Sequence, residues 1–337
     1  MKLNIEQLRA VTCGAVRVEE TDFGFGFFRF TKAQEEMYKA RKEEFYIRCF
    51  ATSGITLNFK TDSKKLFLKG RTTRGSSRKY YSVDVVVNGE PIDHIDNFSH
   101  TDVPERYAGM TLELGSFEKN INLGEGEKEV CVYLPWGHNA EFSEVTLDDG
   151  ATLVPVKYSK KLLAFGDSIT HGYDALRNYD KYVTKLAEAL GCEEYNKAIG
   201  GERFVPSLSA LKEDFVPDII TVAYGSNDWN NVDEQTFTEN CSEFFKNLCT
   251  NYPSVPIFAI TPIWRADLEN ERPMGAFENA DRLISEITAK YDNVRVIHGL
   301  EIFPAEYTLF ADYKLHPSSK GFEHYFKNLY AKIKEII

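Results

Sequence analysis

Four short polar segments contain the residues that can do chemistry. Ser168 comes directly after the run LLAFG, and its hydroxyl can act as a nucleophile. Gly200 and Gly201 stand in NKAIGGE, where the missing side chains let backbone amides approach a ligand closely. Asn227 in AYGSND offers a side-chain amide, and His316 in DYKLHPSSKG offers an imidazole.

These residue types match the requirements of acyl transfer from an ester. Ser168 is the candidate nucleophile, and His316 is the candidate base that takes its proton. The backbone amides of Ser168 and Gly201, with the side-chain amide of Asn227, would form an oxyanion hole. Asp312 would orient His316 and favour its charged form. Ser168 lacks the glycine two positions later that a G-x-S-x-G elbow requires, which argues against an α/β-hydrolase lipase.

The sequence after residue 157 predicts a scaffold that brings these segments together. Apolar runs of strand length alternate there with helical patterns, such as those at 179–190 and 321–337. This alternation predicts a parallel five-stranded sheet with helices on both faces. Ligands bind beyond the carboxyl ends of the strands in such a sheet, so the polar segments are expected at one edge. The candidate strands are 161–166, 193–196, 218–225, 255–261 and 293–299.

The first part of the chain has a different pattern. Short β-rich runs are separated by turn signals such as Asn88-Gly89, and they predict a β-sandwich of the jelly-roll kind. Thr31 and Gln34 resemble a capping box, which predicts a short charged helix within residues 31–46. We therefore predict a β-sandwich domain at 1–157 and an α/β domain at 158–337, joined tightly. The candidate strands of the sandwich are 54–60, 65–72, 80–90, 110–115, 128–135 and 144–156.

The motifs FGDSIT, the glycine after the second strand, YGSND and the late HP…G resemble the four sequence blocks of the SGNH (GDSL-type) hydrolases. The resemblance covers residues 160–337 and implies a three-layer α/β/α fold. It implies Ser168 as nucleophile, the Gly201 backbone and Asn227 as oxyanion donors, and His316 as base. Gly200 is the alternative glycine of the second block. A β-sandwich ahead of such a domain resembles the two-domain SGNH carbohydrate esterases, which remove acetyl groups from sugars.

One position departs from the pattern of that family. The family usually carries an aspartate three residues before the histidine, where this sequence has Tyr313, and the acid stands one residue earlier at Asp312. Two arrangements remain open. A one-residue bulge brings Asp312 back to His316, or Ser168 and His316 form a dyad in which a backbone carbonyl or water holds the histidine. We favour Asp312 as the orienting residue.

Other polar and aromatic residues lie near the predicted strand ends. Asp167 and Asp228 have the positions of carboxylates that bind backbone amides at a helix start, which is a structural role. Trp229, Trp264 and Arg265 either line the substrate pocket or pack at its rim. An aromatic wall would suit a sugar ring, and Arg265 could bind a hydroxyl or carboxylate.

Composition limits the partners and the compartment. The net charge of −11 argues against nucleic acid and anionic membranes as main partners. No run is long enough to span a bilayer, and no signal peptide is evident, so we predict a cytoplasmic protein. The six cysteines show no C-x-x-C spacing and the seven histidines no metal-ligand pattern. We predict free thiols, no metal and no cofactor; the oligomeric state is left open.

These features favour a serine esterase that hydrolyses a small acyl ester, with O-acetyl groups on a carbohydrate as the preferred substrate. The Ser-His(-Asp) site would work through an acyl-enzyme intermediate. An acyltransferase, thioesterase or lysophospholipase is the alternative, because these enzymes would share the nucleophile and the oxyanion hole. A non-catalytic carbohydrate-binding protein is a third reading.

Overall fold

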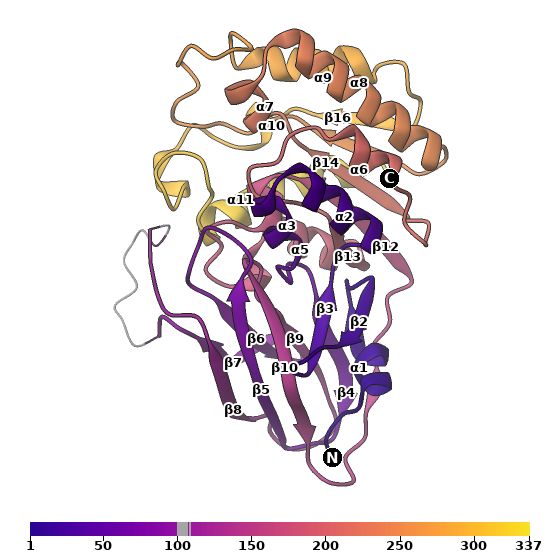
Figure 1. Cartoon of the computed structure of the whole chain (residues 1–337), viewed down its shortest axis with the longest axis vertical. Coiled ribbons are helices and arrows are strands. Elements are labelled where there is room, and N and C mark those ends of the chain that lie inside the picture. The colour runs from indigo at the N-terminus through magenta and orange to yellow at the C-terminus, as the bar shows by residue number, and fades with distance from the viewer. Residues whose placement is uncertain (100–106, 108) are drawn as a thin grey trace.

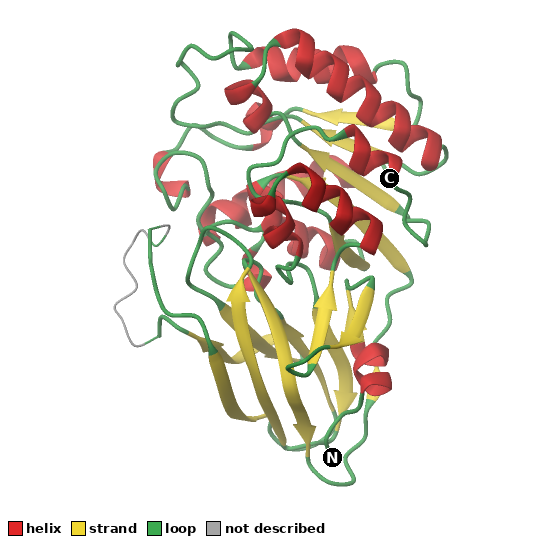
Figure 2. Cartoon of the chain, viewed as in Figure 1, coloured by secondary structure: helices red, strands yellow, loops and turns green. Residues whose placement is uncertain are grey.

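Two antiparallel sheets lie in the first part of the chain, as Figure 1 and Figure 2 show. Their buried residues share one hydrophobic core. The structure is a computed structural model that describes residues 1–99, 107 and 109–337. One sheet has the strand order β1 (Thr12–Cys13), β4 (Thr56–Thr61), β9 (Lys128–Tyr133), β6 (Ser82–Val87) and β7 (Glu90–Asp96), and β11 (Val154–Pro155) also pairs with β4. The other has the order β2 (Arg17–Glu20), β3 (Phe25–Phe28), β10 (His138–Leu147), β5 (Lys65–Arg74) and β8 (Ser116–Asn122).

Alternation along the strands explains this sandwich. Leu66 and Leu68 on β5 are completely buried, whereas the lysines on either side of them are exposed. The predicted hairpin at Asn88-Gly89 is confirmed: both residues have positive φ, 51° and 85°, as a type I′ turn requires. The predicted strand at 110–115 is wrong. Met110 and Leu112 have the spacing of a strand, but they pack against the core of the α/β domain and pair with no other strand.

The helices near the N-terminus are α1 (Ile5–Val11), α2 (Lys32–Arg41) and α3 (Glu43–Cys49). The predicted capping box is confirmed, because the Thr31 side chain accepts from the Gln34 amide and the Gln34 side chain accepts from the Thr31 amide. The helices α2 and α3 pack against the α/β domain: Tyr38 and Cys49 lie in the same core as Leu163 of its sheet. The first part of the chain therefore contributes a layer to the second domain.

The second part of the chain forms the predicted parallel sheet, in the order β13 (Cys192–Asn196), β12 (Lys160–Gly166), β14 (Ile219–Ala223), β15 (Ile257–Ile260) and β16 (Val294–Ile297). Hydrophobic residues of α6 (Pro206–Ala210), α8 (Glu234–Asn251) and α9 (Glu278–Thr288) share one core with the sheet, and residues of α5 (Tyr182–Ala189) and α11 (Ser319–Lys334) share another. These two cores confirm the three-layer fold. The shorter helices are α4 (Ser168–His171), α7 (Ser226–Asn231) and α10 (Gly299–Ile302), with single 3-10 turns at Asn178–Asp180 and Tyr307–Leu309.

The strand register explains why distant segments meet. Gly166 at the end of β12 lies opposite Ala223 on β14, and Ala164 lies opposite Asn196 on β13. The segments that leave these three strands therefore start side by side at one edge of the sheet. Among the described residues, none of the helices combines the length and the apolar character that crossing a membrane requires.

Candidate active site

Ser168 lies at a sharp turn between β12 and α4. Asp167 precedes the helix, and its Oδ1 accepts a hydrogen bond from the Ile169 amide at 3.0 Å, which confirms its predicted structural role. Gly166 is required because a Cβ there would lie 2.2 Å from Oγ1 of Thr170. The turn leaves Ser168 nearly buried, with only 5% of its surface exposed.

The structure brings Ser168, His316 and Asp312 together. The Ser168 hydroxyl lies 2.9 Å from Nε2 of His316, and Nδ1 of the same ring lies 2.7 Å from Oδ2 of Asp312. When Nδ1 donates to Asp312, Nε2 is free to accept the proton of the serine. Asp312 thus contacts His316 although it stands four residues before it.

Tyr313 accounts for the extra residue. Its φ of 59° is in the left-handed region, and the turn lets Oδ1 of Asp312 accept the backbone amides of Lys314, Leu315 and His316 at 2.8–3.1 Å. Burial acts to raise the pKa of Asp312, but hydrogen bonds from His316 and these amides outweigh burial and hold the pKa below its usual range. The Asp312 carboxylate is therefore ionised at neutral pH and can accept the hydrogen bond from Nδ1 of His316.

The two glycines of the pair differ in whether their backbone amides are already used. The Gly200 amide donates to Nδ1 of His171 at 3.2 Å, so it is already used. The Gly201 amide donates no hydrogen bond within the part of the chain that the structure describes, and the residue has a φ of 81°. His171 is completely buried, and its Nε2 donates to the Trp136 carbonyl at 2.9 Å. This histidine, which our sequence reasoning did not single out, fixes the turn.

Asn227 and Ser168 supply the other amides near this point. The Ser168 amide has no hydrogen-bond acceptor among the described residues, because it opens α4. The Asn227 side-chain nitrogen donates to the Glu202 carbonyl at 3.0 Å and, over a longer 3.3 Å, to Asp167. An oxyanion can replace Asp167 as the acceptor of the longer bond from the Asn227 side chain. The geometry is compatible with the predicted oxyanion hole, whose function remains a proposal.

Two predicted pocket residues are buried. Trp229 has no exposed surface, packs against Phe277 and donates from Nε1 to the Gly275 carbonyl. Arg265 is 4% exposed and makes two hydrogen bonds to Asp267. The prediction that Trp229 lines a pocket is therefore wrong, because α7 turns inward directly after β14 and buries this side chain. Arg265 follows β15, and its role at the site stays a prediction.

The third predicted pocket residue is Trp264. It is half-buried and packs against Tyr307 and Phe310. Its role as an aromatic wall of the site stays a prediction.

An ion pair that sequence reasoning missed borders the histidine. Arg78, from the loop after β5 of the sandwich, makes two hydrogen bonds to Asp174, which is completely buried. Asp174 lies 3.6 Å from His316. Asp174, Asp312 and His316 each bring one ligand atom within 4.8 Å of the others, a spacing that a metal site could use. Arg78 already binds both oxygens of Asp174, and the absence of a metal stays a prediction.

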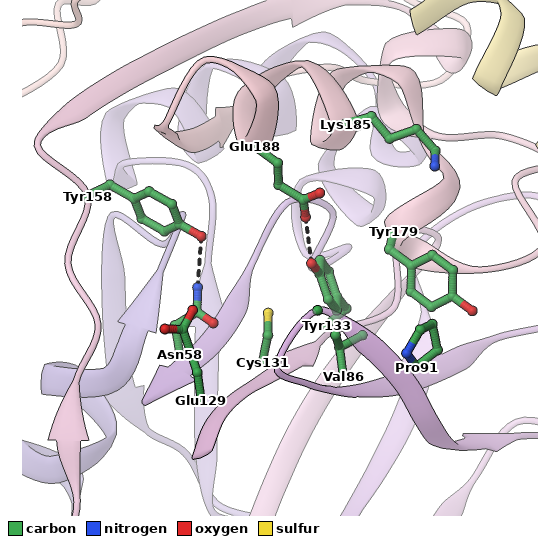
Figure 3. Close-up of a pocket in the computed structure, with 11 residues that line it drawn as sticks. Asn58, Val86, Pro91, Glu129, Cys131, Tyr133, Tyr158, Tyr179, Lys185 and Glu188 are labelled. Carbon is green, nitrogen blue, oxygen red and sulfur yellow. Dashed lines mark hydrogen bonds between the residues drawn. The ribbon is translucent and has the colours of Figure 1, made fainter. Parts of the chain in front are cut away.

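A cavity of about 450 Å³ lies between the sandwich and α5 (Figure 3). Tyr133 on β9 donates to Glu188 on α5 at 2.5 Å, and the Asn58 amide donates to Tyr158 at 3.0 Å. None of the predicted site residues lines it. This cavity is therefore distinct from the place where Ser168, His316 and Asp312 meet.

Buried carboxylates near the site should make stability depend on pH. Asp228 accepts the amides of Phe204 and Gly225, which confirms its predicted structural role, but burial outweighs these bonds and raises its pKa to about 7. A raised pKa stabilises the fold at low pH, and this contribution is lost as the pH rises through 7. We expect the free energy of unfolding to fall by roughly 2–3 kcal/mol from pH 5 to pH 8 through Asp228 alone.

Urea unfolding at several pH values measures this effect. The variant Asp228→Asn should flatten the slope, although burial also raises the pKa of Asp167, to about 6, and that contribution remains. Asp233→Asn is the matched control, because Asp233 is an exposed cap whose pKa is lowered by the Thr236 amide. An Asp228→Asn slope equal to that of the wild type would contradict the expectation.

Residues 164–324 match the model of the GDSL-like lipase/acylhydrolase family. The whole chain is similar in fold to a salicylyl-acyltransferase from a tetracycline biosynthetic pathway, at 20% identity and a TM-score of 0.78, covering 97% of this chain and 95% of the other. It is also similar to a family two carbohydrate esterase from Cellvibrio japonicus (14%, TM-score 0.66, 100% and 97%) and to an acetyl xylan esterase from Butyrivibrio proteoclasticus (16%, TM-score 0.63, 99% and 98%).

A search of curated proteins gives no match. The family match begins on β12, ends in α11 and spans Ser168, Asn227 and His316, whose side chains the fold gathers at one edge of the sheet. Residues 164–324 are therefore similar to the GDSL-like lipase/acylhydrolase family, and a β-sandwich precedes them in the chain.

Proposed function

We propose that the protein is a serine esterase that removes small acyl groups, with O-acetyl groups on a carbohydrate as the preferred substrates. The observation that carries the proposal is the continuous line of hydrogen bonds from Asp312 through His316 to Ser168. Such a line is what converts a serine hydroxyl into a nucleophile at neutral pH.

The proposed reaction has two halves. The Ser168 proton moves to Nε2 of His316 while Oγ attacks the ester carbonyl, and the oxyanion that forms accepts hydrogen bonds from the Ser168 and Gly201 amides and from Asn227. The intermediate collapses, the bond to the alcohol breaks, and His316 returns the proton to the departing alcohol. Water then attacks the acyl-enzyme with His316 again as base, which releases the acid and restores Ser168.

Two observations support a small acyl group on a sugar. Ser168 is only 5% exposed, and we infer that a long acyl chain finds little room beside its hydroxyl. The solved structures that share the arrangement of sandwich and α/β domain include carbohydrate esterases and an acetyl xylan esterase. We propose by analogy that this chain acts on acetylated sugars.

An acyl-chain panel tests the size of the acyl group. We expect kcat/KM for nitrophenyl esters to fall by roughly tenfold or more from acetyl to octanoyl, because each added methylene must be accommodated beside a nearly buried serine. Release of acetate from acetylated xylo- and cello-oligosaccharides, measured in parallel, tests the alcohol. Equal or rising activity toward octanoyl esters would contradict the proposal and favour a lipid substrate.

A second candidate function is acyl transfer. The salicylyl-acyltransferase shares the fold over almost the full length of both chains. A transferase would use the same acyl-enzyme but would pass the acyl group to an alcohol other than water. Adding sugars or small alcohols to the acetyl ester assay and quantifying the new ester separates the two functions.

A further inference from the structure

We propose that Arg78 of the sandwich is a positioning residue for His316 and acts through Asp174, so that neither domain holds a complete site by itself. This inference rests on the proposed function. It gives the sandwich a part in the reaction in addition to any contact with the sugar.

The pair of Arg78 and Asp174 joins segments that are 96 residues apart in the chain. Nε of Arg78 lies 2.5 Å from Oδ1 of Asp174, and Nη2 lies 2.7 Å from Oδ2, which is the two-pronged geometry that fixes both groups in one orientation. Tyr80, from the same loop of the sandwich, donates its hydroxyl to Oδ1 at 3.0 Å. Asp174 is completely buried, so these are the partners on which its charge depends.

The pair lies against the side of the imidazole that faces away from Ser168. Oδ2 of Asp174 is 3.6 Å from Nδ1 of His316, and Nη2 of Arg78 is 3.5 Å from the same nitrogen. The ring of Tyr173 packs beside the imidazole with centroids 5.6 Å apart, and the Arg78 guanidinium lies 5.3 Å from the Tyr173 centroid. Arg78 therefore lies next to His316 and also contacts Asp174 and Tyr173, which border the same imidazole.

Two carboxylates thus stand near one N–H of the imidazole. Oδ2 of Asp312 accepts this N–H, with 2.7 Å between oxygen and nitrogen. The nearest oxygen of Asp174 is 3.6 Å from the same nitrogen, and both oxygens of Asp174 are bound to Arg78. Without Arg78, Asp174 would be a buried charge that lacks its cation and competes for Nδ1. The ring would turn toward Asp174, and Nε2 would move away from the serine hydroxyl. By pairing with the charge of Asp174, Arg78 keeps Nδ1 of His316 hydrogen-bonded to Asp312.

The backbone of Asp174 supports a role for the pair. Its φ of 69° is uncommon for a residue with a side chain. Such a conformation persists where surrounding contacts hold it, and here the contacts come from Arg78 and Tyr80 of the other domain.

Labelling of Ser168 with a small fluorophosphonate measures the effect without a known substrate. In this step the Oγ–P bond forms, the P–F bond breaks, fluoride leaves and the serine proton goes to His316. We expect Arg78→Ala to slow labelling by roughly 10–100-fold, the cost of misplacing a reacting group by about 1 Å. With an ester substrate, kcat should fall by a similar factor and KM should stay nearly constant.

The double variant Arg78→Ala/Asp174→Asn distinguishes positioning from general loss of structure. Removing the competing charge should restore part of the labelling rate that Arg78→Ala loses, whereas a merely structural role predicts a further loss. Arg71→Ala is the matched control: Arg71 lies on β5 and binds Glu141 at 2.7 Å within the sandwich. It should label at the wild-type rate. If Arg78→Ala does not fold, Arg78→Lys keeps the charge without the two-pronged geometry and should label several-fold more slowly.

The outcomes are separable. Wild-type labelling that Arg78→Ala leaves unchanged overturns the positioning role, and so does a rise in KM at constant kcat, which would make Arg78 a substrate-binding residue. A double variant slower than Arg78→Ala overturns the competition between the two carboxylates. Failure of the wild type to label would overturn the proposed function and the positioning role together.

Discussion

Replacing Ser168 by alanine should lower kcat for a small ester by about 10⁴- to 10⁶-fold. The hydroxyl is the atom that attacks in the proposed reaction, and its proton is the one that His316 receives. Removing it leaves the oxyanion donors in place, so a small residual rate over water is expected. The substitution removes one oxygen from a nearly buried side chain without creating a large cavity, so the protein should fold as before.

Steady-state kinetics on a nitrophenyl acetate and acetate release from an acetylated sugar check this result. Ser226→Ala is the control, because Ser226 is also a buried serine just after a strand of the same sheet, and its Oγ accepts from Arg265 at 3.0 Å. It should keep most of the activity. Thermal unfolding of both variants shows that the fold is retained. If Ser168→Ala released acyl groups at the wild-type rate, the proposed nucleophile would be wrong.

The sequence was sufficient to predict residues whose position depends on the ends of strands. Ser168 and Asn227 follow continuous apolar runs, and such runs form adjacent parallel strands because both faces of the sheet are covered. The edge of the sheet then brings them together whatever the lengths of the intervening helices. His316 lies at no strand end, and it was predictable only from its place directly before the last helix, α11.

Other features depend on conformations and contacts that no local pattern contains. The contact between Asp312 and His316 needs a positive φ at Tyr313, a residue type that rarely adopts it. Arg78 and Asp174 meet only because the two domains pack together. Trp229 has the expected position after a strand, but its burial follows from the direction in which the next short helix turns.

Replacing Asp312 by asparagine should lower kcat by roughly 10²- to 10⁴-fold with little change in KM. An asparagine can still accept the backbone amides at 314–316 through its oxygen, so the turn can be kept. Its NH₂ group would then face Nδ1 of His316, where the carboxylate now accepts. The ring would have to carry its proton on Nε2, and it could not take the proton of Ser168.

Tyr313→Asn is the matched control for this measurement. It changes the position at which the family usually carries its acid, and asparagine tolerates the positive φ that Tyr313 adopts, so activity should stay near that of the wild type. Unchanged turnover in Asp312→Asn would show that Ser168 and His316 work as a dyad. The histidine would then depend on the other carboxylate within reach, Asp174. In that case Asp174→Asn should cause the larger loss, and comparing the two variants identifies which acid orients the base.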